Sequence, residues 1–246
     1  VDEVLTRHSV PLTRSGDPVD VPESLRRSDG SSVYTVAGAQ LFTSPDLLAA
    51  EARIVARAGQ RDGMVAPASA VNLAMLSSTA NGLPLNAGQA TLVREMATSG
   101  ARLQLAIAPA GAGKTTAMRA LAHAWIEGGG TVRGLAPSAA AADVLGANIQ
   151  ATTDTMAKLT WHLDHPALGE LPEWATSIGP TTLVVIDEAG MADTLSLDKV
   201  MDFVIERGGS VRLIGDDQQL AAVGAGGVLR DIQATHGSLH LTELMR

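Results

Sequence analysis

The chain lacks cysteine and has few aromatic residues and few lysines. Its 246 residues contain no cysteine, two phenylalanines, one tyrosine, three tryptophans and three lysines. Without cysteine the chain can form no disulfide and no thiolate metal site, and cysteine redox chemistry is excluded. The net charge of −8 argues against a strongly basic nucleic-acid clamp, because such a clamp needs clustered lysine and arginine to neutralise phosphates. A localised binding groove stays compatible with this composition.

Long hydrophobic runs are also missing. No stretch of about 18 apolar residues occurs, and residues 1–10 lack the basic and apolar regions of a signal peptide. At 46% hydrophobic composition the chain can still bury a full core. We therefore expect a cytoplasmic protein without membrane contact and, because no initiating methionine is present, a piece of a longer chain.

The most informative segment is AIAPAGAGKTT, residues 106–116. An apolar run typical of a buried strand leads into it, and helical spacing of apolar residues follows it. In a P-loop, glycines let backbone N–H groups converge on phosphates at a helix N-terminus, a lysine reaches the β- and γ-phosphates, and a hydroxyl binds their Mg²⁺. Thr115 is the expected Mg²⁺ ligand. The predicted nucleotide-binding residues in this segment are Ala110, Gly111, Ala112, Gly113, Lys114, Thr115 and Thr116.

One position departs from the strict pattern G-x-x-x-x-G-K-[ST], because Ala108 stands where the first glycine is expected. The alternative interpretation is a strand-to-helix turn that contains an incidental lysine. The order of strand, loop and helix favours the P-loop.

A second motif is LVVIDEAGM, residues 183–191. Four apolar strand residues end in two acids. Asp187 can hold the Mg²⁺ shell, and Glu188 can orient and deprotonate an attacking water. The alternative is an acid pair that caps a following helix. Together with the P-loop, the pair predicts nucleotide hydrolysis.

A third motif is VRLIGDDQQLAAVGAGGVL, residues 211–229. Another apolar strand ends at Gly215, and Gln219 follows four residues later. Its amide is expected to reach the γ-phosphate or the attacking water in the crevice at the strand ends. Taken alone, this run is equally well a strand followed by a polar turn.

From residue 86 onward, helical stretches alternate with apolar β-rich runs, which is typical of a parallel sheet covered on both faces. The apolar runs predict strands over residues 103–108, 131–136, 182–187, 210–215 and 238–241. Apolar spacing predicts helices over residues 45–58, 87–99, 114–127, 138–146, 153–163, 195–207 and 226–233. The proline- and glycine-rich residues 1–40 predict an irregular leader.

Taken together, the three motifs resemble motifs one to three of superfamily one DNA helicases, and they occur in that family's order. The likeness is to the RecD-like branch, which includes the helicase portion of MobF-type conjugative relaxases of the TraA, TrwC and TraI types. It covers residues 83–246 and implies a RecA-like P-loop NTPase domain of α/β class that uses ATP and Mg²⁺. Residues 1–82 are then a mainly helical N-terminal accessory region.

The resemblance adds further site residues. Gln89 corresponds to the family's glutamine motif and would read the adenine edge, although Asn86 and Gln89 also fit a capping box. Pro137, Ser138 and Thr155 correspond to DNA-backbone contacts, although Ser138 is equally well a helix N-cap. Arg246 corresponds to an arginine that stabilises charge on the γ-phosphate, although a terminal arginine is usually a solvated side chain.

The resemblance implies the ATP-hydrolysing motor of a DNA helicase, with Lys114, Glu188, Gln219 and Arg246 as its catalytic set. Expected partners are single-stranded DNA, a second RecA-like domain that this chain lacks, and the proteins of a conjugative relaxosome. Without that second domain we expect slow hydrolysis and no unwinding. The enzyme alternatives are a RecD-like exonuclease V alpha subunit and a stand-alone helicase. The non-enzyme alternative is a helicase-like module that binds DNA or a relaxase without turnover.

Overall fold

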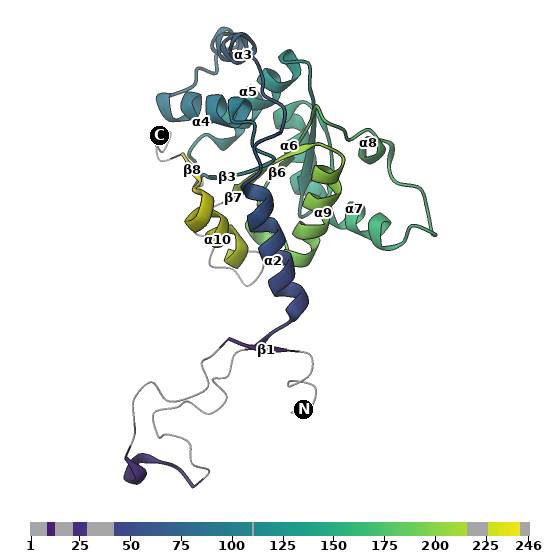
Figure 1. Cartoon of the computed structure of the whole chain (residues 1–246). Coiled ribbons are helices and arrows are strands. Elements are labelled where there is room, and N and C mark those ends of the chain that lie inside the picture. The colour runs from purple at the N-terminus through teal and green to yellow at the C-terminus, as the bar shows by residue number, and fades with distance from the viewer. Residues whose placement is uncertain (1–8, 13–21, 29–41, 110, 216–225, 242–246) are drawn as a thin grey trace. The chain divides into compact units, whose positions relative to one another are not determined.

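The computed structural model describes residues 9–12, 22–28, 42–109, 111–215 and 226–241 (Figure 1). The chain divides into two compact units, Val1–Ala50 and Glu51–Arg246. In the first unit, strands β1 (Val10–Pro11) and β2 (Phe42–Thr43) pair antiparallel, and a single 3-10 turn, η1, covers Glu23–Leu25. These short elements are consistent with the proline- and glycine-rich composition of this part of the chain.

The second unit is built on a six-stranded sheet in the order β5-β4-β6-β7-β3-β8. Every neighbouring pair of strands in it is parallel. Helical crossovers between parallel strands place all the strand C-terminal ends at one edge of the sheet. The strands are β3 (Leu103–Ile107), β4 (Thr131–Ala136), β5 (Thr152–Thr155), β6 (Thr182–Ile186), β7 (Ser210–Gly215) and β8 (Leu239–His240).

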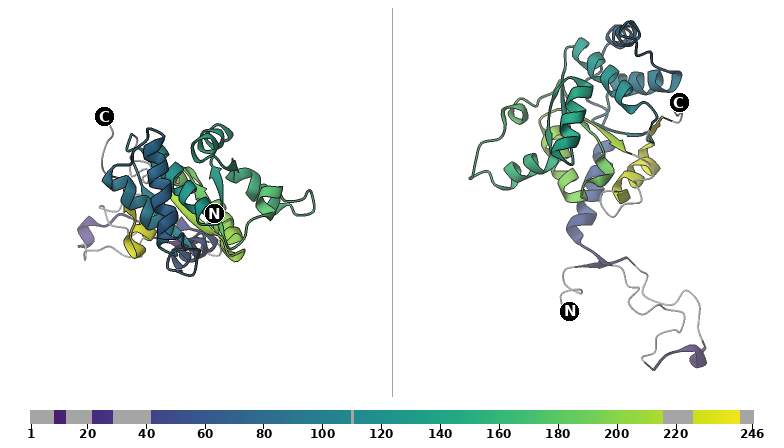
Figure 2. Two further views of the ribbon diagram at one scale, coloured as in Figure 1. Left: turned by 90° about the horizontal axis from the view of Figure 1, so that it is seen from above. Right: turned by 180° about the vertical axis from the view of Figure 1, so that it is seen from behind.

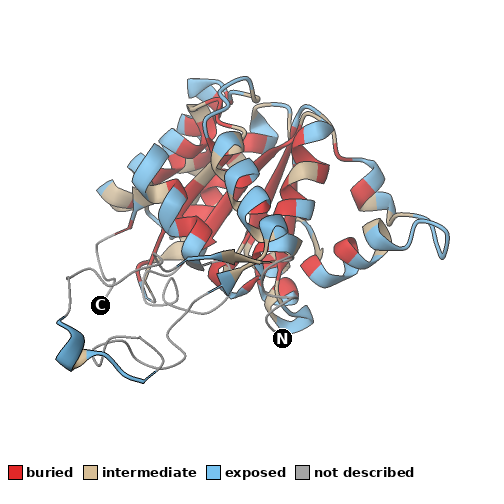
Figure 3. Cartoon of the chain, turned by 60° about the horizontal axis from the view of Figure 1, so that its bottom comes forward, coloured by how far each residue is buried: buried red, intermediate tan, exposed pale blue. Residues whose placement is uncertain are grey.

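Helices cover both faces of this sheet (Figure 2). Alternate residues of a strand face opposite sides, so Leu103 and Leu105 enter one core while Ala106 enters the other. The first core is closed by α2 (Pro45–Ala58), α7 (Met156–Asp164), α8 (Glu173–Thr176), α9 (Thr194–Glu206) and α10 (Gly226–His236). The second is closed by α3 (Ala68–Ala80), α4 (Ala87–Thr98), α5 (Lys114–Glu127) and α6 (Ala139–Ile149). Figure 3 shows the buried strands between exposed outer helix faces. The predicted α/β class with a parallel sheet flanked by helices is confirmed.

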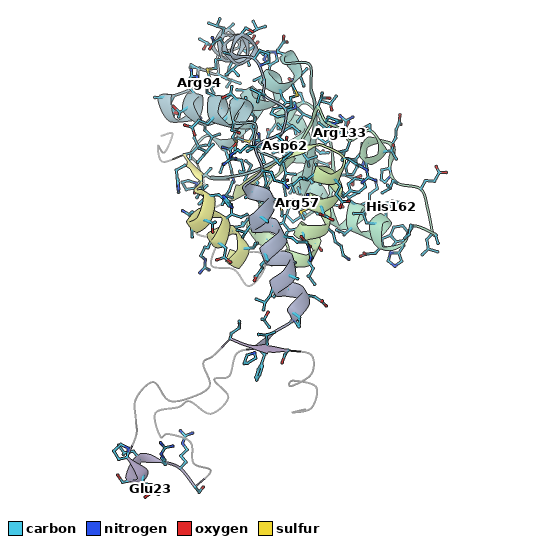
Figure 4. All side chains as sticks on the ribbon, in the orientation of Figure 1. Glu23, Arg57, Asp62, Arg94, Arg133 and His162 are labelled. Atoms are coloured by element: carbon cyan, nitrogen blue, oxygen red, sulfur yellow. The ribbon has the colours of Figure 1, made fainter. Side chains whose placement is uncertain are left out.

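Ion pairs attach α2 to α9 with the same four-residue spacing on both helices. Arg53 lies 2.5 Å from Asp198, and Arg57, labelled in Figure 4, lies 2.5 Å from Asp202. The predicted start of α2 is also present, because the Leu47 N–H donates a hydrogen bond to the Ser44 hydroxyl.

One prediction of local structure was wrong, and one helix was given no bounds. Residues 153–163 were expected as one helix, but Thr152–Thr155 form strand β5, because β-branched threonines pair with the exposed edge of β4. Helix α3 lies in the region that was expected to be mainly helical, but its bounds were not predicted. It packs on both α4 and α5 through small residues such as Ala70 and Ala74, so its sequence shows no clear apolar stripe.

The domain boundary at residue 82 stays a prediction. Residues 51–82 belong to the same compact unit as the sheet, and α3 packs against α5. Among the helices that the structure describes, none is long and apolar enough to cross a membrane.

A fully buried arginine lies in the middle of the sheet. The Arg212 guanidinium donates two hydrogen bonds to the Met96 carbonyl, one to the Ala101 carbonyl and one to that of Val211. Burial, with a smaller contribution from the positive charge of Arg61, lowers the pKa of Arg212 to about 9. The side chain is therefore still charged at neutral pH, and it ties β7 to the C-terminal end of α4, where carbonyls lack helical partners.

We predict that Arg212→Met lowers the free energy of unfolding by about 3 kcal/mol, because it leaves the buried carbonyls of Met96 and Ala101 without donors. Urea denaturation measures this change. Arg94→Met, on the exposed side of the same helix α4, is the matched control and should change stability little. Equal effects of the two substitutions would contradict a special role for the buried guanidinium.

Candidate nucleotide-binding site

The P-loop connects β3 to α5 at the C-terminal edge of the sheet. Gly111 and Gly113 have φ angles of 80° and 74°, in the left-handed region that glycine adopts without steric cost. Helix α5 begins at Lys114 directly after Gly113, so its free N–H groups lie at the loop. This is the backbone arrangement that binds phosphate at a helix N-terminus.

The departure at Ala108 does not disturb the loop. Ala108 is buried, and among the described residues with a side chain only Gln150 and Glu188 have a positive φ. The backbone at position 108 therefore does not require glycine. Its N–H donates to the Gly215 carbonyl at 2.9 Å, which joins the start of the P-loop to the end of β7.

The structure brings the lysine of the P-loop to the acid pair after β6. The Lys114 Nζ lies 3.9 Å from the Asp187 Oδ1, and both side chains are about one-third exposed, at 27% and 30%. The Asp187 N–H donates to the Leu135 carbonyl, which extends the pairing of β6 with β4 by one residue. The sheet edge therefore holds a cation and a carboxylate where a phosphate chain and its metal ion could meet.

The residues at this edge fit Mg²⁺. Asp187 offers a carboxylate, and Thr115, in the first turn of α5, offers an exposed hydroxyl. Both are hard oxygen donors of the kind that Mg²⁺ prefers. Within the described part of the chain there is no group of three or more His, Cys, Asp or Glu able to hold a metal ion by itself.

Glu188 has a backbone conformation that is unusual for a residue with a side chain. Its φ is 52°, in the left-handed region, and its N–H donates to the Asp187 Oδ1 at 2.9 Å. The short helix η2 (Ala189–Met191) follows directly and packs against β7. Strained conformations of this kind persist where surrounding structure holds them, and they concentrate at functional sites.

Gln89 forms the capping box that the sequence allowed as one of two interpretations. The Gln89 N–H donates to the Asn86 Oδ1 at 2.8 Å, and the Asn86 N–H donates to the Gln89 Oε1 at 2.9 Å. The Gln89 Nε2 also donates to the Gly113 carbonyl at 3.0 Å. The adenine contact of Gln89 stays a prediction.

The region that carries this geometry matches a known protein family. A family model described as an AAA domain matches residues 84–246. The chain belongs to this family. The match covers the region that the three motifs had marked.

Three relatives of this chain are named as conjugal transfer proteins. Proteins named conjugal transfer protein TraA from Agrobacterium fabrum and Rhizobium radiobacter are each 32% identical to the chain over 148 residues. A probable conjugal transfer protein TraA from Sinorhizobium fredii is 31% identical over 147 residues. The aligned segment covers 59% of this chain and 12% of each relative. The predicted resemblance to a TraA-type protein is confirmed, and the chain spans a small part of such a protein's length.

The predicted DNA contacts of the AAA domain lie at the same sheet edge as the P-loop. Ser138, after Pro137, caps α6 and accepts a hydrogen bond from the Ala141 N–H at 3.2 Å. Thr155 caps α7 and accepts one from the Lys158 N–H at 3.2 Å. The capping role of Ser138 is confirmed. DNA contact by Pro137, Ser138 and Thr155 stays a prediction.

Three predicted site residues, Ala110, Gln219 and Arg246, lie outside the described residues. The strands that lead to two of them are described. Gly215, the last described residue before Gln219, pairs with Ile107. The Leu241 N–H, five positions before Arg246, donates to the Ile107 carbonyl. Gly215 and Leu241 therefore both lie beside the strand that carries the P-loop.

Sequence reasoning missed Asp154, which shapes the segment that contains Thr155. Its carboxylate accepts hydrogen bonds from Lys158 at 2.7 Å, from the Trp174 indole at 3.1 Å and from the Thr155 N–H at 2.9 Å. Burial alone would raise the pKa of Asp154, but these bonds outweigh burial and hold the pKa below its usual value. An aspartate directly before a threonine that can cap a helix is visible in the sequence, and it could have marked Asp154 as a residue that holds this segment in place.

We predict that Asp154→Asn lowers the free energy of unfolding at pH 7 by about 1 kcal/mol. Because the folded-state pKa is lowered, the carboxylate stabilises the fold above its unfolded pKa, and this contribution is lost as pH falls through the folded pKa. Urea denaturation at pH 7 and near pH 3 should therefore show a difference that shrinks in acid. Asp143→Asn, on the exposed surface of α6, is the control. A difference that stays constant with pH would show that the charge of Asp154 is not responsible.

Proposed function

We propose that this AAA domain binds ATP with Mg²⁺ and hydrolyses it as the motor of an ATP-dependent DNA helicase. The observation that carries the proposal is the distance of 3.9 Å between the Lys114 Nζ and the Asp187 Oδ1. It joins the phosphate-binding loop to the acid pair in one site. A P-loop alone supports nucleotide binding, and the acid pair beside it supports hydrolysis.

The residues have distinct roles in this proposal. The N–H groups at the start of α5 and the Lys114 ammonium bind the phosphate chain and offset the negative charge that develops on it. Thr115 and Asp187 would hold Mg²⁺, which when bound supplies further positive charge at the β- and γ-phosphates. Gln219 and Arg246 are the proposed residues that sense and stabilise the γ-phosphate.

Glu188 is the proposed general base. It orients a water, whose oxygen forms a bond to the γ-phosphorus while the bond from that phosphorus to the departing ADP oxygen breaks. The proton of the water passes to the Glu188 carboxylate. The left-handed backbone at Glu188 supports this role, because it sets the direction in which the Glu188 side chain leaves the backbone next to Asp187.

The proposed track is single-stranded DNA, bound across the ends of β4 and β5 at Pro137, Ser138 and Thr155. The relatives are named as conjugal transfer proteins, which supports a role in conjugation as the helicase part of a TraA-like relaxase. Further proposed partners are a second RecA-like domain and relaxosome proteins, and the proposed location is the cytoplasm.

We predict that Glu188→Gln lowers the single-turnover rate of ATP hydrolysis in the presence of single-stranded DNA by about 10²- to 10⁴-fold. Nucleotide affinity should stay unchanged, because the amide keeps the size and polarity of the side chain. Release of radioactive phosphate measures the rate, and displacement of a fluorescent ADP measures the affinity.

Glu173→Gln, an exposed carboxylate on α8, is the matched control and should leave both quantities unchanged. A wild-type chain that binds ATP but does not hydrolyse it with DNA present would point instead to the non-catalytic binding module. Hydrolysis that survives in Glu188→Gln would show that another residue is the base.

A further inference from the structure

The Gln89 side chain is enclosed between the start of α4 and the P-loop. It is 0% exposed. Its Oε1 accepts a hydrogen bond from the Asn86 N–H at 2.9 Å, and its Nε2 donates to the Gly113 carbonyl at 3.0 Å. Both ends of the amide are therefore engaged by backbone groups of the protein. Because the side chain is fully buried, a nucleobase could reach this amide only if the packing around it opened.

The bond to Gly113 acts on a peptide group that matters for phosphate binding. The Gly113 carbonyl and the Lys114 N–H belong to the same planar peptide, and in a trans peptide they point in opposite directions. The Gly113 carbonyl also accepts from the Ala117 N–H in the first turn of α5. With its carbonyl held by Gln89 and by Ala117, this peptide directs the Lys114 N–H outward from the N-terminus of α5. Phosphate binds on that side of a helix end.

Helix α4, which carries Gln89, is itself held in place by packing and by hydrogen bonds. Its buried residues Leu92, Val93 and Met96 pack in the second core, and Arg212 holds its last turn from β7. The capping box fixes its first turn. Helix α4 is therefore held at both of its ends. Because of this, the Gln89 side chain loses little further conformational entropy when it bonds to Gly113.

We propose that Gln89 is a positioning residue, which orients the Lys114 N–H toward the phosphates and does not read the base. This inference rests on the proposed function, because it concerns the same nucleotide site. It implies that Gln89 contributes equally to the binding of ATP, of GTP and of a triphosphate that carries no base.

The substitution Gln89→Glu separates the cap from the contact with the P-loop. A glutamate keeps an oxygen that accepts from the Asn86 N–H and is itself favoured in capping boxes. It loses the donor to the Gly113 carbonyl and places a carboxylate against that oxygen. We expect the dissociation constants for ATP, GTP and inorganic tripolyphosphate, each with Mg²⁺, to rise by the same factor of about ten.

A second readout is the pH profile of this loss. When the introduced carboxyl group is protonated, its O–H can donate to the Gly113 carbonyl in place of the lost amide. The ratio of variant to wild-type dissociation constants for tripolyphosphate should therefore fall toward one as pH is lowered. A ratio that does not change with pH would overturn the hydrogen-bond account.

The matched control is Asn86→Ala, which removes the other half of the capping box and leaves the Gln89 bond to Gly113 in place. It should lower the thermal midpoint while changing tripolyphosphate affinity by less than about twofold. If Gln89→Glu shows no cooperative thermal transition, Gln89→Met, which is apolar and of similar size, is measured with the same expected common loss.

The outcomes are distinguishable. A loss confined to ATP, with tripolyphosphate unchanged, would overturn the inference and assign Gln89 to adenine recognition. No loss for any of the ligands would also overturn it. A wild-type chain that binds neither ATP nor tripolyphosphate would instead refute the proposed nucleotide site itself.

Discussion

The parallel pairing of β3, β7, β6 and β4 positions both the candidate site and the helices around it. It places every strand's C-terminal end at one edge, and backbone bonds continue the pairing past the strands. The Ala108 N–H bonds to Gly215, and the Asp187 N–H bonds to Leu135. Lys114 and Asp187 lie close together because each follows a strand that ends at this edge. The register of the parallel strands therefore places the candidate site.

Two buried polar side chains then hold α4 against the sheet and the P-loop. Arg212 donates hydrogen bonds to the C-terminal end of α4. Gln89, at the N-terminal end of α4, donates a hydrogen bond to the P-loop. Apolar packing alone tolerates small shifts of a helix, whereas a buried donor without its acceptor costs free energy at once. These two residues therefore specify where α4 lies. The same helix connects the middle of the sheet to the phosphate-binding loop.

Most of the fold could be predicted from the sequence, because the signals are local. Apolar, β-rich runs predicted five strands, and glycines followed by Lys114 predicted the loop and the start of α5. The failures have a common cause. Strand β5 forms because β4 offers an edge to pair with, and α3 is covered by α4 and α5 through small residues, so neither element carries its own periodic pattern.

The residues that set the chemistry of the site can be identified without a structure: the glycines, the lysine, the hydroxyl and the acid pair each lie in a recognisable local sequence context. How these residues act on one another depends on the folded arrangement. It brought Lys114 to Asp187, placed Gln89 against Gly113, and buried Arg212 under α4. These contacts join residues far apart in the chain, and their geometry depends on strand order and helix packing, which no local pattern specifies.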